Sequence, residues 1–254
     1  MKRTIATMVM LACSPLAAAQ IATIDGTGTA SGNGNGGFGG VIGTGSLDVE
    51  TLADGTVNIT LNTGAGSLND RAVIYIDSVA GGFSSTNALS DTGDDGRRAI
   101  SGNGANGESS DLGFAPGFEA DFAVTYEVAF SGLWDLQSDP ANFAAPISIG
   151  TDAMRTAADA SFGVSFNLAD IGLTAGDSFT LVATYLNSGN AFRSGELIGS
   201  AASGPFPADP NIGQNGFSLG QDDFVLVNSI PAPGGVALLG FAGLAVSRRR
   251  RLPA

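Results

Sequence analysis

Apolar and polar residues alternate along several short stretches of this 254-residue chain, and this period of two restricts the fold more than any other feature. Successive side chains of an extended chain point to opposite faces, so each stretch presents one apolar face. The alternating positions are Leu47, Val49 and Thr51; Val57, Ile59 and Leu61; Phe122, Val124, Tyr126, Val128 and Phe130; and Phe162, Val164, Phe166 and Leu168. The pattern predicts β-strands that need a second layer to cover their apolar faces.

Three further runs, at residues 72–77, 178–186 and 224–227, are apolar at most positions, which predicts central strands covered on both faces. Turn signals rich in glycine separate the runs, and Leu52–Thr56 has the composition of a hairpin. We therefore expect an all-β fold, an antiparallel β-sandwich such as a jelly roll, with long glycine-rich loops. Helix is expected only in short pieces, at residues 140–143 and 151–159.

Two stretches interrupt the strand pattern. Residues 26–45 are rich in glycine and predict a flexible or irregular edge, whereas residues 84–117 form a long polar excursion. We expect the ordered core at residues 46–228, within an ectodomain of residues 20–230.

Histidine is absent from the whole sequence, and Cys13 is its single cysteine. Catalytic arrangements that pair serine or cysteine with histidine are therefore excluded, as are imidazole zinc sites. Once an N-terminal leader that contains Cys13 is removed, no disulfide and no thiolate metal site remains. We accordingly expect a protein that is not an enzyme; a carboxylate-based activity is the alternative that this residue set leaves open.

Residues 20–230 contain five arginines, no lysine and all 24 acidic residues, which gives this part of the chain a net charge of −19. Such a charge repels phosphate backbones, so we expect no nucleic-acid partner. Acidic side chains also keep a secreted surface hydrated, which is the simplest interpretation of the excess.

The N-terminus has the three parts of a secretory signal peptide at residues 1–19. Lys2 and Arg3 are positively charged, residues 5–12 are apolar, and Ala17 and Ala19 form a small-residue cleavage site before Gln20. We expect signal peptidase to cleave after Ala19. Lipoprotein processing at Cys13 is the alternative.

The C-terminal residues 231–254 consist of a proline motif, an apolar segment and a basic cluster. Pro231, Ala232, Pro233 and Gly234 precede an apolar run that reaches residue 246, and Arg248, Arg249, Arg250 and Arg251 follow it. This order resembles the PEP-CTERM sorting signal that exosortases recognise, with Ala232 at the position of the glutamate that gives the signal its name. The resemblance implies sorting to the cell surface by an exosortase-like enzyme.

The apolar run at residues 234–246 predicts a short helix in transient contact with the membrane. It would be about 20 Å long, against a hydrocarbon core of about 30 Å. The arginines would stay on the cytoplasmic side. An ordinary C-terminal membrane anchor is the alternative.

Three carboxylates lie close together in the glycine-containing segment at residues 91–96: Asp91, Asp94 and Asp95. Hard cations such as Ca²⁺ prefer oxygen ligands of this kind, so the segment is a candidate calcium loop. The distal glutamate of a calcium loop is missing, and Arg97 and Arg98 follow directly. A solvated acidic loop is the alternative.

The succession of residues 71–77, 81–83, 120–124 and 168–173 resembles DOMON and family-nine carbohydrate-binding sandwiches, in which a strand ending in an Ile-Asp pair precedes a variable loop. This resemblance implies a non-catalytic sandwich that binds sugar. Tyr75, Asp77 and Trp134 are the candidate ligand-binding residues, because aromatic rings stack on sugars. A single tryptophan among apolar neighbours is also typical of a core.

These features predict an exported, surface-sorted structural or adhesive protein that associates with the extracellular polysaccharide matrix. The expected partners are signal peptidase, an exosortase-like enzyme and extracellular polysaccharide. The alternative function is a non-catalytic carbohydrate-binding module, with or without calcium.

Overall fold

The computed structural model describes residues 19–29, 38–149, 155–199, 217–219 and 223–231. The strands are β1 Ala19–Thr29, β2 Ser46–Leu52, β3 Thr56–Asn62, β4 Arg71–Asp77, β5 Leu112–Gly113, β6 Phe122–Glu127, β7 Phe130–Asp135, β8 Ser148–Ile149, β9 Ser161–Asn167, β10 Ser178–Asn187, β11 Phe192–Ile198, β12 Phe217–Ser218 and β13 Val225–Asn228. The helices are η1 Thr86–Ala88, α1 Asp95–Ser101 and η2 Leu168–Ile171.

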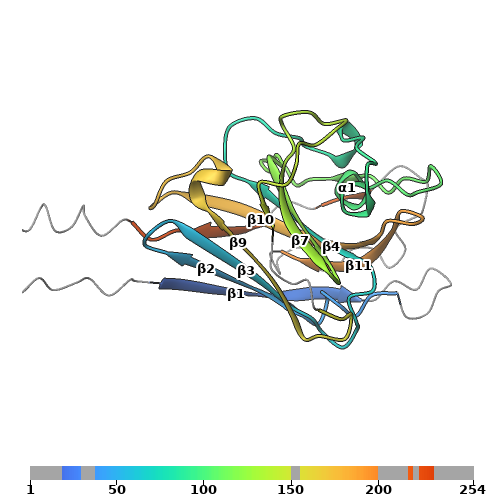
Figure 1. Ribbon diagram of the computed structural model, residues 1–254, viewed down its shortest axis with the longest axis horizontal. Helices are drawn as coiled ribbons and strands as arrows, with labels where there is room; N and C mark the ends of the chain where they lie inside the picture. The colour runs from blue at the N-terminus through green and yellow to red at the C-terminus, as the bar shows by residue number, and fades with distance from the viewer. Residues whose placement is uncertain (1–18, 30–37, 150–154, 200–216, 220–222, 232–254) are drawn as a thin grey trace, which may run out of the picture.

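Eleven strands form one sheet, in the order β8-β7-β6-β4-β10-β11-β1-β2-β3-β9, with β13 paired to β10 beside this path. Neighbouring strands of this sheet run antiparallel, whereas β5 and β12 form a small separate parallel pair. The ends of the sheet approach each other, since the Ser131 hydroxyl on β7 donates a hydrogen bond of 2.9 Å to the Gly163 carbonyl on β9. The sheet is thus nearly barrel-shaped (Figure 1).

The prediction of an all-β, antiparallel fold is confirmed, and the finer assignment to a sandwich stays a prediction. The predicted hairpin at Leu52–Thr56 joins β2 to β3. Gly55 lies at its corner with a φ of 91°, a conformation that glycine adopts without steric cost, and its N–H bonds to the Leu52 carbonyl at 3.0 Å.

The inside of the curled sheet is filled by the alternating side chains of β2, β3 and β9, as predicted. They meet apolar side chains from β4, β6 and β10. Tyr126 on β6 reaches across this interior, where its hydroxyl donates a 2.7 Å hydrogen bond to the Ile59 carbonyl on β3.

Two strand predictions were wrong. Residues 122–130 do not form one alternating strand, because the chain turns at 128–129 and returns as β7. β6 is buried on both faces, so its pattern is more continuous than that of a half-exposed strand. The run at 224–227 is not a central strand either: among the described strands β13 pairs with β10 alone, and Leu226 is 57% exposed.

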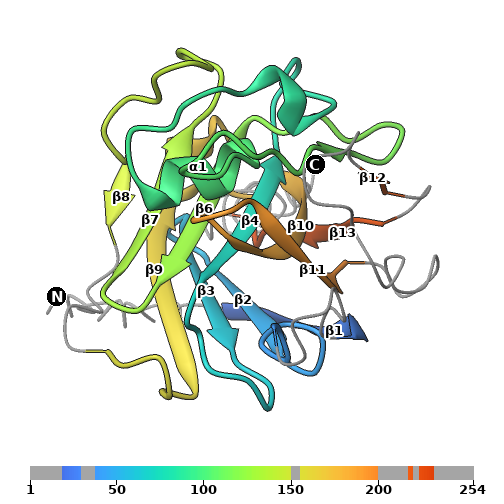
Figure 2. The ribbon, with the colours of Figure 1, turned by 90° about the vertical axis from the view of Figure 1, so that its right-hand side faces the viewer.

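The excursion at residues 84–117 is folded and covers the outer face of the sheet (Figure 2). A second apolar core lies beneath it, where α1 and neighbouring loop residues pack on Val73, Tyr75 and Ala123. The long polar segment therefore covers a core, and some of its polar residues, such as Thr86, Asp91 and Ser110, are themselves buried.

Helix α1 lies in this excursion, where the sequence analysis placed none. Asp94 caps its N-terminus by accepting a 2.9 Å hydrogen bond from the Arg97 N–H, and Gly102 ends it with a φ of 70°. The helix expected at residues 140–143 is a turn. Of the helix expected at residues 151–159, the first four lie outside the described residues and the remainder contains a turn.

Part of the glycine-rich segment at residues 26–45 is held in place. Its first residues belong to β1, and residues 38–45 pack against the buried Glu196 on β11. The Glu196 carboxylate accepts hydrogen bonds from the N–H groups of Gly40 and Gly43, at 2.7 and 3.0 Å. Of the two expectations for this segment, a flexible or an irregular edge, residues 38–45 fit the irregular one, and a buried carboxylate fixes part of their backbone.

Both ends of the described chain leave the barrel at the same end (Figure 1). β1 begins at Ala19, which pairs with Leu52. Near the other end, the Ser229 hydroxyl accepts a hydrogen bond from the Gly176 N–H and donates one to the Asp177 carbonyl, at 2.8 and 2.7 Å. The fold is thus fastened two residues before Pro231.

Most of the predicted terminal signals lie outside the described residues. Ala19, Gln20 and the exposed Pro231 are described. Outside the described residues lie Ala17, residues 232–246 with the motif positions Ala232, Pro233 and Gly234, and the cluster Arg248 to Arg251. Within the described part of the chain, no helix is long and apolar enough to cross a membrane.

Candidate functional site

The three residues predicted to bind a ligand do not lie together. Tyr75 is fully buried in the second core, where its hydroxyl donates a 2.8 Å hydrogen bond to the Ile100 carbonyl of α1. Its ring packs edge-on against Phe114, with ring centroids 4.8 Å apart. Tyr75 has no exposed surface for a ligand, because the folded excursion covers it.

Asp77 lies at the end of β4 beside other carboxylates. Its carboxylate accepts a 3.2 Å hydrogen bond from the Glu119 N–H. Burial raises its pKa, and the nearby charges of Asp121 and Glu119 raise it further, against the effect of that hydrogen bond. Asp77 does not line the groove described next.

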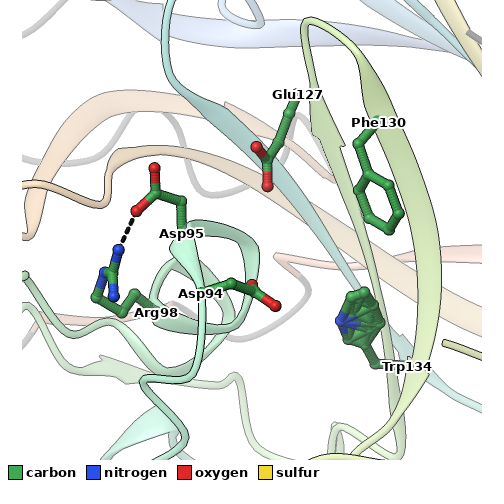
Figure 3. A pocket seen from close by; sticks show the side chains of 6 residues that line it. All are labelled: Asp94, Asp95, Arg98, Glu127, Phe130 and Trp134. Carbon is green, nitrogen blue, oxygen red and sulfur yellow. Dashed lines mark hydrogen bonds and ion pairs between the residues drawn. The ribbon is translucent and has the colours of Figure 1, made fainter. Parts of the chain in front are cut away.

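Trp134 borders an open groove with a volume of about 470 Å³ (Figure 3). Its lining consists of Asp94, Asp95, Arg98, Glu127, Phe130 and Trp134, and these six residues define the aromatic groove. Two structural units build it: the hairpin of β6 and β7 on one side, and the start of α1 on the other.

Helix α1 sits close to the hairpin because residue 96 is a glycine. A Cβ atom at Gly96 would lie 2.9 Å from Glu127 Oε1 and 3.3 Å from Thr125 Oγ1 on β6. The absence of a side chain at this position lets Asp94 and Asp95 approach Glu127 across the groove.

Arginines hold the carboxylates of the groove in place. Arg71 bonds to Asp95 at 2.8 Å and to Glu127 at 3.0 Å, and Arg98 also pairs with Asp95. Burial raises the pKa of Glu127, and the charge of Arg71 counteracts this rise. A bridged arrangement of this kind fixes the directions of the carboxylate oxygens that remain free to accept hydrogen bonds.

Trp134 contributes a polar group that has no protein partner among the residues that the structure describes. Its side chain is 2% exposed, and its indole Nε1 is buried without a hydrogen bond. Figure 3 shows this nitrogen on the side of the ring that faces Asp94. Phe130, only partly buried, packs beside it with ring centroids 5.6 Å apart.

The three carboxylates of the predicted calcium loop point to different partners. Asp91 is buried and accepts hydrogen bonds from the N–H groups of Gly93 and Phe143, at 2.8 and 2.5 Å. Asp94 caps α1, and Asp95 pairs with arginines. Within the described ranges, no group of three or more acidic side chains is placed to hold a metal ion.

Sequence reasoning identified Trp134 but missed Glu127, Phe130 and Arg98 as neighbours in one groove. The treatment of residues 122–130 as a single strand put Glu127 and Phe130 on one extended segment, whereas the tight turn at 128–129 places Glu127 on β6 opposite Phe130 on β7, the strand that also carries Trp134. The helix signals that place Arg98, an Asp94 cap and a Gly102 terminus, are both visible in the sequence.

The groove combines an aromatic edge, an unpartnered N–H donor and oriented acceptors, so it can bind a ligand that has an apolar face and several hydroxyl groups.

No protein family, no curated protein and no solved structure matches this chain.

Proposed function

We propose that the chain is an exported adhesive protein that is sorted to the cell surface and resides in the extracellular polysaccharide layer. The observation that carries the proposal is the order of proline motif, apolar run and arginine cluster, which begins two residues after Ser229, the residue that fastens the fold. The proposal includes no catalytic activity.

The arrangement of the chain ends supports this function. Cleavage after Ala19 would leave β1 intact from Gln20 onward, and a tail that starts at Pro231 would leave from the same end of the barrel. The rest of the protein, which carries the aromatic groove, would then project away from the membrane during sorting.

Deletion of residues 231–254 tests the sorting proposal in the native host. The intact protein should be recovered from the surface matrix, whereas the truncated protein should be released into the medium. A matched control replaces Arg248 to Arg251 with lysine, which keeps the positive charge that the positive-inside rule requires. Equal distribution of intact and truncated protein would contradict the proposal.

The second candidate function is a non-catalytic carbohydrate-binding module, related to the DOMON-like sandwiches that the sequence resembles. The aromatic groove favours it, because an aromatic ring beside oriented carboxylates is a common way to hold a sugar. A glycan array with and without a chelator tests this function and its calcium dependence. Silence on every glycan would reject it.

A further inference from the structure

We propose that the aromatic groove selects uncharged sugars and rejects uronates, an inference that rests on the carbohydrate-binding function above. The lining residues determine this choice through three properties: a donor without a partner, acceptors in fixed positions, and an excess of negative charge.

The donor is the indole N–H of Trp134. It is buried and lacks a partner, although buried tryptophan N–H groups usually have one. The partly exposed ring of Phe130 packs beside it. The indole nitrogen lies on the side of the ring that faces Asp94, which is the side from which an acceptor oxygen of a ligand in the groove would reach the N–H (Figure 3).

The acceptors are the carboxylates of Asp94, Asp95 and Glu127. Their side chains are 50%, 45% and 22% exposed, so each has oxygen surface that a ligand reaches. Ionised carboxylates accept hydrogen bonds but donate none, so the ligand must supply hydroxyl donors. A sugar ring offers these hydroxyls together with an apolar C–H face for Phe130.

The charge of the lining excludes acidic sugars. Three carboxylates and one arginine line the groove. Behind the lining, Arg71 and Arg97 pair with these carboxylates and the buried Asp91 pairs with Arg97, so four carboxylates face three arginines and the network keeps one excess negative charge. A uronate would place another negative charge among these carboxylates, in a protein whose residues 20–230 already carry a net charge of −19. Specificity against acidic polysaccharide then comes from repulsion.

Trp134 is the only tryptophan of the chain, so its fluorescence reports directly on the groove. We would titrate the purified residues 20–230 portion, alongside the full chain, with mannan, galactan and β-glucan oligosaccharides, and with oligogalacturonate. At least one neutral series should shift the emission with saturation, while oligogalacturonate binds at least tenfold more weakly at low salt. A uronate that binds as tightly as every neutral sugar would overturn the inference.

Two variants connect the signal to the groove. Glu127→Gln removes an acceptor charge with little change in shape, and Phe130→Ala removes the aromatic face; each should weaken neutral-sugar binding about tenfold. Glu50→Gln on β2, in another part of the sheet, is the matched control and should leave binding unchanged. Unchanged thermal unfolding of the variants would show that the fold is intact.

The outcomes separate this inference from the function on which it rests. Sugar binding on the array without a Trp134 response or an effect of either variant would reject the groove and leave the carbohydrate-binding function standing. Silence on the array together with silent fluorescence would reject both.

Discussion

Arg193 is fully buried, although its guanidinium carries a positive charge. It donates hydrogen bonds to Thr184 Oγ1 at 2.7 Å and to the Ser110 carbonyl at 3.0 Å, and burial lowers its pKa. A single side chain thus connects β11 and β10 to the excursion that covers the outer core. At the scale of residues, this arginine is one of the polar links between the sheet and its lid, beside Tyr75 and Arg71.

Arg193→Met should lower the free energy of unfolding by about 1–3 kcal/mol, because it leaves buried acceptors without a donor. Urea unfolding measures the change. Arg155→Met is the control, because Arg155 is partly exposed and its hydrogen bond to the Ser161 carbonyl holds a loop to β9. This substitution should lower the free energy of unfolding by less than Arg193→Met does. An equal loss in both variants would contradict the role given to Arg193.

Asp77→Asn should stabilise the protein at neutral pH. Burial raises the pKa of Asp77 in the folded state, so the protonated carboxyl is favoured by folding. Its contribution to the free energy of unfolding is complete below the unfolded-state pKa of about 3.9 and is lost as the pH rises through the folded-state pKa. The neutral amide avoids that loss and still accepts the hydrogen bond from the Glu119 N–H.

Thermal unfolding at pH 3 and at pH 7 measures this effect, and the gain should be present only at pH 7. Asp159→Asn provides a control of opposite sign, because hydrogen bonds from Thr156 lower the pKa of Asp159 and its ionised form stabilises the fold. A gain from Asp77→Asn of the same size at both pH values would show that the carboxyl charge is not its cause.

At the scale of elements, β1 joins the two halves of the sheet. Residues 19–25 pair with β2, and from Gly26 onward the strand pairs with β11. The carbonyl of Ile42 occupies the place of a side chain at this junction, only 1.6 Å from where a Cβ of residue 26 would lie. The path of β1 between its two partners therefore requires glycine.

Gly26→Ala should destabilise the protein by several kcal/mol or prevent folding, because backbone rather than a flexible side chain blocks the new methyl group. Gly163→Ala on β9 is the matched control: the nearest atoms to its Cβ lie 4.0 Å away, and its effect should stay within about 1 kcal/mol. Chemical denaturation compares the two. Similar stability of both variants would contradict the close approach at Gly26.

Strands with one exposed face were predictable from their alternation, and β4 and β10, which are buried on both faces, were predictable from their continuous apolar runs. The β6–β7 hairpin and helix α1 were not. β2, β3 and β9 show their burial in their alternation. The turn between β6 and β7 carries no glycine or proline, so nothing local marked it at residues 128–129. Helix α1 has good capping residues, but Gly96 lowers its helix propensity. Packing of Ala99 and Ile100 in the second core stabilises it.

The candidate groove was less predictable than the fold, because its residues meet only through tertiary structure. Trp134 stood out as the single tryptophan, but its partners depend on the hairpin and on a helix more than thirty residues away in the chain. Tyr75 was a candidate because it is also aromatic, but it is fully buried. The sequence gives no local sign that the excursion at residues 84–117 covers it.

At the scale of the whole molecule, the excess of acidic residues affects stability. The 24 carboxylates repel one another across a body with five arginines, and salt screens this repulsion. We expect the thermal midpoint of residues 20–230 to rise as NaCl increases from about 0.02 M to about 0.5 M, over which the Debye length falls severalfold. A midpoint that falls over this range would show that attractive surface pairs dominate.

The central claim concerns the processing and destination of the protein, and intact mass spectrometry of the protein from its native host tests it most directly. A species that begins at Gln20 and ends between Pro231 and Gly234 is the predicted result. A species that still carries Arg248 to Arg251 would contradict proteolytic sorting and would show that the C-terminal tail is retained.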